Sequence, residues 1–214
     1  MTSNWRLGQW RGVPISLHWT VLIGIPWFYY ETRSLVATAI AFGAFFFLIL
    51  IHELGHAAVA RWRGVDVDRI QLFFIHGTCS LREEPLYELD DVLIAWGGVA
   101  AQFVVLVIAF SADLLLAAFA PSAYWMASPA LRVLIGANLF IMIVNLIPVA
   151  PFDGFRAWRI LPILRDWWQE TSWAASLRRR SAARETARTK KLEAKSERIA
   201  ADIIDKLKKR KSDA

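Results

Sequence analysis

Two histidines and a glutamate lie within five consecutive residues, His52-Glu53-Leu54-Gly55-His56. On a helix, residues four apart share one face, so both imidazoles can bind the same metal ion. Glu53 lies about 100° round the helix from His52 and can reach a water molecule on that ion. An ionisable triplet within an apolar helix is costly unless it has a function. The spacing predicts a metal site with a general base beside it; a pair of structural histidines is the weaker alternative.

A catalytic zinc site normally has three protein ligands and an open fourth position, so a third ligand is needed. Asp153 is the best candidate, because it follows Pro148 and Pro151, which stop a helix and free backbone groups. Irregular backbone at membrane depth is tolerated where protein or a polar cavity surrounds it. The alternative reading is a helix end with an Asp-Gly turn. A cluster that resembles a solvated acidic face supplies the other candidate ligands: Glu83, Glu84, Glu88, Asp90 and Asp91.

Long apolar segments must position these residues, and 56% of the chain is hydrophobic. Four segments contain no Asp, Glu, Lys or Arg: Gly12–Tyr30, Ser34–Ile51, Val92–Ala112 and Val133–Phe152. Because a helix needs about 20 apolar residues to cross a bilayer, a disordered chain, a disulfide-rich secreted protein and a plain soluble enzyme are excluded. We predict an all-α polytopic membrane protein with four transmembrane helices, at about 17–31, 36–60, 92–114 and 131–151.

The positive charge of the chain is concentrated at its C-terminus. From Ser176 onward, 14 Lys or Arg accompany 6 Asp or Glu, whereas the preceding residues carry 11 against 13. The basic pI therefore belongs to this tail and does not indicate a nucleic-acid groove on a folded domain. We expect a membrane domain over 1–165 and a basic, helical, cytoplasmic tail over 166–214. A narrow apolar stripe on this tail fits self-association, binding to anionic lipid or a solvated helix: Leu192, Ile199, Ile203 and Leu207.

The distribution of arginines predicts the orientation of the chain, since short cytoplasmic loops are enriched in Lys and Arg. Arg61, Arg63 and Arg69 follow the second apolar segment, whereas the opposite side holds Arg33 and Arg132. Both termini should therefore face the cytoplasm. This orientation also brings the histidine pair and the aspartate to a similar depth.

A short, membrane-associated β-hairpin is predicted over about 65–82, where apolar and polar residues partly alternate. His76 and Cys79 within it look like half of a metal site. The chain has one cysteine and no second half-site. A turn histidine and a small buried cysteine are the better explanation.

Together, the two motifs resemble those of the site-2 protease family, which are intramembrane zinc metalloproteases. The family pattern is HExxH on one membrane helix and an Asn-x-x-Pro-x-x-Pro-x-Asp-Gly-like stretch two spans later. The second stretch corresponds here to Asn145–Gly154, and the resemblance covers about 36–165, the three-helix catalytic core of the family. It implies one Zn²⁺ per chain and roles at five positions: the zinc ligands His52, His56 and Asp153, the general base Glu53, and Asn145 as the residue that holds the substrate or the developing oxyanion.

The resemblance also implies that a strand near the active site pairs with an unwound substrate. The third span departs from the family, because a Gly-Pro-x-x-Asn type of element is matched by Gly97–Gln102, without Pro and with Gln in place of Asn. A stretch of small residues that allows close helix packing explains Gln102 at least as well as a polar role does. The candidate substrate-binding residues are Ile70, Leu72, Phe74, Pro148 and Pro151.

The activity implied by the resemblance is hydrolysis of a peptide bond in or near the transmembrane segment of a single-span membrane protein, such as an anti-sigma factor. The expected form is a minimal one, without a PDZ or CBS domain, in a bacterial or archaeal plasma (inner) membrane. Membrane lipid and a second copy of the chain, through the spans or the tail, are further expected partners, and nucleic acid is not. A metal transporter that uses the same three ligands and a catalytically silent binding homologue are the alternatives.

Overall fold

The computed structural model describes residues 4–171 and 173–212, in two compact units. The first unit ends at Ile160 and contains a four-stranded sheet together with all the long apolar helices. The second unit begins at Leu161. It holds most of α7 (Ile160–Thr171) and all of α8 (Trp173–Ser212), the helix that carries the basic tail.

The sheet corrects the predicted all-α class, because the N-terminal residues form a second hairpin. Its strands are β1 (Asn4–Trp10), β2 (Val13–His18), β3 (Val67–Leu72) and β4 (Gly77–Leu81), in the order β1-β2-β3-β4. The β1–β2 and β3–β4 pairs are antiparallel, and β2 runs parallel to β3. The predicted hairpin over 65–82 is confirmed as β3 and β4.

The sequence contains a signal for the N-terminal hairpin within the apolar segment that was predicted to be the first span. Val13, Ile15 and Leu17 alternate with Pro14, Ser16 and His18, which is the pattern of a half-buried strand. The turn before this strand has positive φ at Arg11 (48°) and Gly12 (87°). Two consecutive residues with positive φ are the signature of a tight hairpin turn.

The predicted first span, 17–31, is not one continuous membrane helix. Its beginning lies in β2, and the rest forms a 3₁₀ helix, η1 (Trp19–Ile23), followed by α1 (Gly24–Thr32). Together η1 and α1 rise by roughly 24 Å, short of the roughly 30 Å of a bilayer core. This segment packs along the first half of α2, where the Phe28 ring lies 6.1 Å from that of Phe42 and Thr32 Oγ1 lies 2.7 Å from Thr38 Oγ1.

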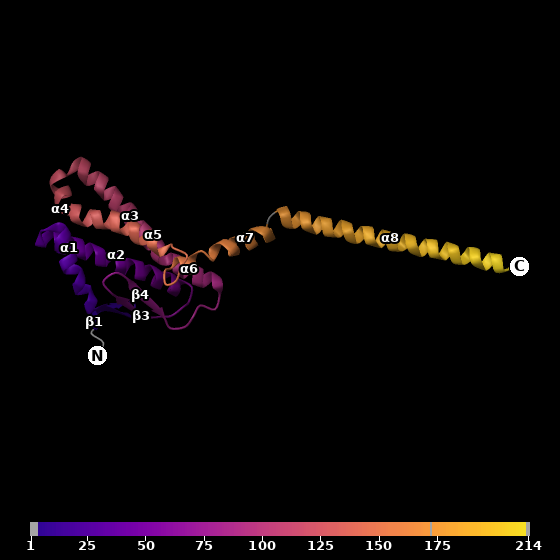
Figure 1. Ribbon diagram of the computed structural model, residues 1–214, viewed down its shortest axis with the longest axis horizontal. Helices are drawn as coiled ribbons and strands as arrows, with labels where there is room; N and C mark the ends of the chain where they lie inside the picture. The colour runs from indigo at the N-terminus through magenta and orange to yellow at the C-terminus, as the bar shows by residue number, and fades with distance from the viewer. Residues whose placement is uncertain (1–3, 172, 213–214) are drawn as a thin grey trace. The chain divides into compact units, whose positions relative to one another are not determined.

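Within the described residues, three helical segments are long and apolar enough to cross a membrane: α2 (Leu35–Trp62), α3 (Glu88–Phe119) and the continuous run Pro121–Asn145. That run comprises α4 (Pro121–Arg132), a π-helical turn, η2 (Val133–Ala137), and α5 (Asn138–Asn145). In Figure 1 it returns alongside α3. The predicted spans 36–60 and 92–114 fall inside α2 and α3. The predicted span 131–151 starts and ends earlier, because Pro121 opens the helix and the chain turns before Pro148.

Local chemistry sets the ends and the close packing of the two longest helices. The Ser34 side chain caps α2, and Gly64 follows its last turn with a positive φ of 78°. The first turn of α3 carries acidic side chains, whose negative charge interacts favourably with the positive end of the helix dipole. Gly55 on α2 and Gly97 on α3 let the backbones touch, since a Cβ atom on Gly97 would lie 2.6 Å from the carbonyl oxygen of Gly55.

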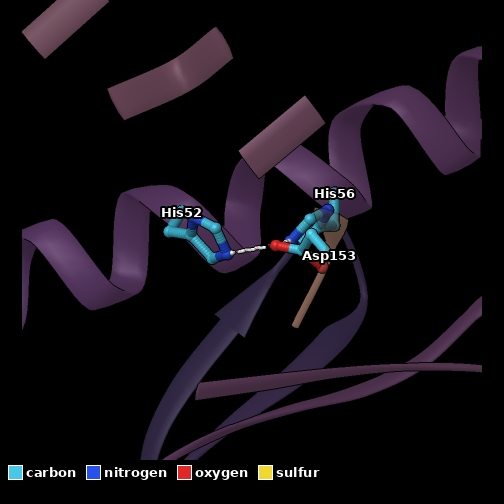
Figure 2. A group of neighbouring side chains, drawn as sticks. All are labelled: His52, His56 and Asp153. Atoms are coloured by element: carbon cyan, nitrogen blue, oxygen red, sulfur yellow. Dashed lines mark hydrogen bonds and ion pairs between the residues drawn. The ribbon is translucent and has the colours of Figure 1, made fainter. Parts of the chain in front are cut away.

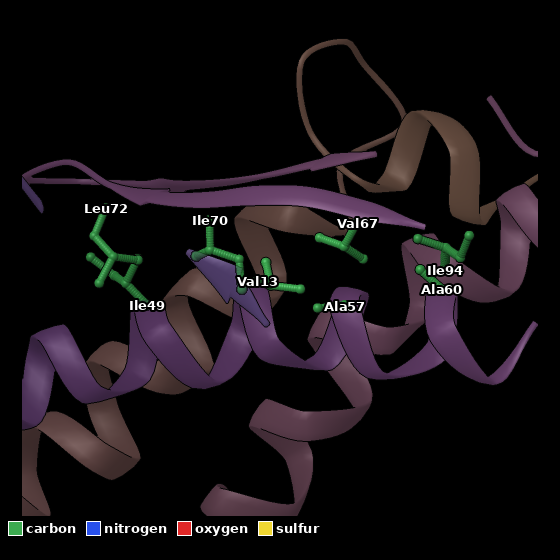
Figure 3. Close-up of a cluster of buried hydrophobic side chains, with 8 residues drawn as sticks. All are labelled: Val13, Ile49, Ala57, Ala60, Val67, Ile70, Leu72 and Ile94. Carbon is green, nitrogen blue, oxygen red and sulfur yellow. The ribbon is translucent and has the colours of Figure 1, made fainter. Parts of the chain in front are cut away.

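The hydrophobic core lies between the sheet and the C-terminal half of α2. Figure 3 shows Val67, Ile70 and Leu72 directed from β3 toward the helix, where they meet residues such as Ile49 and Ala57. Ile70 is fully buried, and Leu72 is 2% exposed. The sheet therefore covers the stretch of α2 that carries the histidine pair.

The first compact unit ends at Ile160, and the boundary between membrane domain and tail at 165 and 166 stays a prediction. The basic stretch from Ser176 lies within α8. On the predicted apolar stripe, Leu192 is exposed. The side chains of Ile199, Ile203 and Leu207 lie outside the residues whose side chains the structure describes.

Candidate metal centre

The two histidines of α2 and Asp153, which lies 97 residues after His56 in the chain, meet at one point (Figure 2). Nε2 of His52 and Nε2 of His56 are 3.0 Å apart. Oδ2 of Asp153 lies 3.0 Å from the first nitrogen and 3.2 Å from the second. Both histidines are buried, at 6% and 7% exposure. Among the described residues, this is the one cluster of at least three His, Cys, Asp or Glu side chains arranged to hold a metal ion.

The hydrogen bonds at the far side of each imidazole determine which atom faces the cluster. Nδ1 of His56 lies 2.7 Å from the backbone carbonyl oxygen of Ile94, and Nδ1 of His52 lies 2.9 Å from Oε1 of Gln102. Both oxygens only accept hydrogen bonds, so in the neutral rings Nδ1–H donates and Nε2 carries a lone pair. Two nitrogen lone pairs and a carboxylate oxygen therefore converge with no donor between them.

This donor set fits zinc. Imidazole nitrogen and carboxylate oxygen are ordinary zinc ligands, and tetrahedral bonds of about 2.0–2.1 Å place ligand atoms about 3.3 Å apart. The three observed separations of 3.0–3.2 Å are within a few tenths of an ångström of that value. Repulsion among three converging acceptors would be relieved by a divalent cation. Three ligands also leave one position of a tetrahedral site for water or substrate.

Glu53 lies beside the cluster and beneath strand β4. It is 4% exposed, and its carboxylate accepts a hydrogen bond from the backbone N–H of Cys79. A Cβ atom on Gly77 would lie 2.5 Å from Oε1 of Glu53, so the absence of a side chain at Gly77 lets the strand approach this closely. The arrangement provides a carboxylate next to the metal position, as a general base requires.

Two tryptophans hold the loop that carries Asp153. Nε1 of Trp158 donates to the carbonyl oxygen of Leu146 at 2.6 Å, and Nε1 of Trp96 donates to that of Ala157 at 3.0 Å. Their rings pack edge to face, with centroids 6.1 Å apart. Asp153 directly precedes α6 (Gly154–Ala157), so these contacts fix both sides of the turn that presents the carboxylate.

Ion pairs join the same turn to the start of α3. Asp91 accepts hydrogen bonds from Arg156 and from Arg159, the latter at 2.9 Å. The pairing raises the pKa of Arg156 above its ordinary value. These ion pairs hold the segment that follows Asp153 against the start of α3.

The acidic loop residues considered as alternative ligands have other partners or lie elsewhere. Asp90 pairs with Arg63 at 2.5 Å, and Asp91 pairs with the two arginines after Asp153. Glu88 faces Arg159 at 3.8 Å. Among the described residues, the cluster that could bind a metal includes none of these three residues, and it includes neither Glu83 nor Glu84.

The other predicted site residues lie around the cluster in different ways. Asn145 is the last residue of α5 and is partly buried, with no side-chain hydrogen bond among the described residues. Pro148 and Pro151 are exposed on the turn before Asp153. Ile70 and Leu72 belong to the core, so their side chains face α2, not a substrate. Phe74 packs against Phe45, with ring centroids 6.4 Å apart.

Two residues that touch the histidines were placed by the sequence in a stretch of small residues for close helix packing, with a polar role left open for one of them, Gln102. Gln102, fully buried on α3, accepts a hydrogen bond from His52. Gly98 leaves the space that both rings occupy, because a Cβ atom there would lie 2.6 Å from His52 Cε1 and from His56 Nε2. Gln102 lies four residues after Gly98 and therefore on the same face of α3. This spacing is the signal in the sequence that could have linked both residues to the histidines.

The His76 and Cys79 pair does not extend the metal cluster. The His76 ring stacks on Phe73 with centroids 4.8 Å apart. Burial, together with the nearby Glu53 carboxylate, raises the pKa of the Cys79 thiol to about 12. The thiol is therefore protonated at neutral pH, as the reading of a small buried cysteine implies.

Comparisons with known proteins find relatives that bear metalloprotease names. A Mycobacterium tuberculosis protein named as a zinc metalloprotease (Rip3) is 30% identical over 170 residues, which cover 70% of this chain and 41% of that protein. A zinc metalloprotease of Methanocaldococcus jannaschii is 29% identical over 171 residues, covering 75% of this chain and 46% of that protein. The chain thus spans less than half the length of these curated relatives. No protein-family model matches it.

A solved structure shares the fold. The site-2 protease from Methanocaldococcus jannaschii superposes with a TM-score of 0.53 at 25% sequence identity, covering 74% of this chain and 71% of that one.

Proposed function

Because the chain is a member of the site-2 protease family, we propose that it is an intramembrane zinc metalloprotease that hydrolyses a peptide bond in or near the transmembrane segment of another membrane protein. The observation that carries the proposal is the convergence of His52, His56 and Asp153 with Glu53 beside them on apolar helix α2. A metal-binding site alone does not need the glutamate. Its presence favours hydrolysis over simple metal binding.

In this proposal, each residue of the site has a separate task. His52, His56 and Asp153 hold one Zn²⁺, which supplies the Lewis acidity that makes water a nucleophile near neutral pH and polarises the scissile carbonyl. Glu53 takes the proton from the attacking water and passes it to the leaving amine. Asn145 holds the substrate or donates a hydrogen bond to the developing oxyanion.

The substrate helix must unwind before hydrolysis, because helical backbone hides its carbonyl groups. We propose that the unwound segment adds to the sheet at β4, which is the edge strand nearest Glu53. Strand β3 is paired on both sides, so it has no free edge for a substrate. Phe74 and the exposed Pro148 and Pro151 remain candidates for side-chain contacts.

The proposed location is a bacterial or archaeal plasma (inner) membrane, with several crossings and both termini in the cytoplasm. The N-terminal hairpin lies at the C-terminal end of α2, where Arg61 donates to the carbonyl oxygen of Arg11 at 2.8 Å, so η1 and α1 carry the chain to the opposite end of α2. The arginine distribution supports this orientation. The proposed partners are a single-span membrane-protein substrate, such as an anti-sigma factor or a similar regulator, and membrane lipid. A second copy of the chain, joined through the spans or the tail, is a further proposed partner.

The experiment that tests this proposal separates metal binding from cleavage. The purified protein should hold one zinc per chain by elemental analysis, and Asp153→Ala should lose it. Glu53→Gln should keep zinc and lose cleavage of single-span test proteins by about 10²-fold or more, because proton transfer by a positioned base contributes about 10²–10⁴-fold.

Two outcomes would favour other functions. Zinc flux into liposomes that survives Glu53→Gln would support a transporter that uses the same ligands. Zinc binding without cleavage by the wild-type protein, across the whole substrate screen, would support a silent binding homologue. Cleavage retained by Glu53→Gln would remove Glu53 from the role of base.

A further inference from the structure

The two histidines of the site are oriented by different kinds of partner. Nδ1–H of His56 donates to a backbone carbonyl oxygen, that of Ile94, on α3. Nδ1–H of His52 donates to a side chain, that of Gln102, on the same helix. The orientation of His56 is therefore independent of side-chain identity, whereas that of His52 depends on one residue.

Gln102 can hold His52 in a metal-binding state in one orientation of its amide only. With Oε1 toward the ring, Nδ1 carries the proton and Nε2 is free to bind a metal. With the amide reversed, the NH₂ group would face Nδ1 and leave the proton on Nε2, where it would prevent metal binding. Nε2 of Gln102 has no hydrogen-bond partner among the described residues, so the contact with His52 is the one interaction found for this amide.

A third core helix fixes the backbone of Gln102. Asn138, the first residue of α5, is fully buried, and its Nδ2 donates to the carbonyl oxygen of Gln102 at 3.0 Å. The π-helical turn η2 directly precedes Asn138, and such turns shift the register of the residues that follow them. Residues from α2, α3 and α5 therefore meet in one buried chain of contacts from Asn138 through Gln102 to His52.

We propose that Gln102 is a positioning residue that holds the His52 ring in its metal-binding tautomer and orientation. This inference rests on the proposed function of the site. It differs from the packing role that small neighbours such as Gly97 and Gly98 suggest for this stretch, because it requires a hydrogen-bond acceptor at position 102. Partners of this kind raise the basicity of metal-bound histidines, and their loss typically weakens metal binding about 10–100-fold.

The test compares two substitutions that fill similar space with opposite chemistry. Zinc affinity is measured by chelator competition on the full-length protein in detergent. Gln102→Met removes the acceptor and should weaken zinc binding about 10–100-fold. Gln102→Glu keeps an acceptor for Nδ1–H and should bind zinc at least as tightly as the wild-type protein. Gln71→Met, the same substitution on strand β3 away from the cluster, is the matched control and should leave zinc affinity unchanged.

The order of the two variants decides the outcome. A residue that only fills space predicts the reverse order, since Met is the better apolar replacement and a buried Glu is the worse one. Equal zinc affinity of Gln102→Met and wild type, or an equal loss in both Gln102 variants, would overturn the inference. Absence of zinc from the wild-type protein would instead overturn the proposed function, so the two failures are distinguishable. The Co²⁺ absorption spectrum of each variant reports the ligand geometry independently of activity.

Discussion

Gly98 provides a sharp test of the metal centre, because it contacts both histidines and binds nothing itself. A Cβ atom at this position would lie 2.6 Å from Cε1 of His52 and 2.6 Å from Nε2 of His56. Ordinary contacts with a Cβ atom begin at 3.4 Å. In Gly98→Ala, each ring must therefore move by about 0.8 Å relative to α3. Imidazole rings can rotate, so we expect the variant to fold but with its ligands displaced.

The size of the effect follows from the tolerance of zinc bonds. Metal–ligand distances in a competent site lie within about 0.2 Å of their ideal values. A displacement of about 0.8 Å is four times larger, so at least one histidine is lost as a ligand. Disturbing the partner of a single ligand already costs about 10–100-fold. We therefore expect Gly98→Ala to weaken zinc binding by at least about 100-fold, or about 2.8 kcal/mol.

The assay is zinc per chain by elemental analysis together with chelator competition, with circular dichroism to check folding. Gly43→Ala is the matched control, because it adds the same methyl group on α2 where no atom lies within 4 Å. We expect the control to keep zinc and to gain up to about 1 kcal/mol in stability from its helix propensity. Wild-type zinc affinity in folded Gly98→Ala would refute the assignment of His52 and His56 as joint ligands.

Two further predictions concern the base and the packing around the site. Gly77→Ala would place a Cβ atom 2.5 Å from Oε1 of Glu53, so cleavage should fall while zinc content stays at the wild-type level. Loss of both cleavage and zinc, or of neither, would contradict the proposed contact between β4 and the base. Asn138→Ala removes the buried hydrogen bond from Nδ2 of Asn138 to the carbonyl oxygen of Gln102, which keeps its helical partner within α3, so the free energy of unfolding in detergent should fall by about 0.5–1.5 kcal/mol. An unchanged denaturant midpoint would show that this contact does not stabilise the helices.

The sequence predicted those parts of the molecule that depend on local spacing and on composition. His52 and His56 share a helix face because their separation of four residues fixes it, whatever the rest of the chain does. The long apolar runs identify α2 and α3 as membrane helices for a similar reason, since helix length and hydropathy are local properties. Asp153 was identified by the prolines before it, and the structure brings its carboxylate to the histidines.

Tertiary structure decided the features that depend on which segments meet. The 17–31 segment has the composition of a span, yet its first residues pair as β2 with β3, more than 50 residues away along the chain. Ile70 and Leu72 were predicted to contact substrate, but packing on α2 places them in the core. Gln102 and Gly98 lie in the stretch that departs from the family's Gly-Pro-x-x-Asn type of element, and an amide and a missing side chain gain their roles only from the ring that each one faces. Spacing along a helix fixes which residues share a face, whereas the partner of that face is chosen by the packing of distant segments.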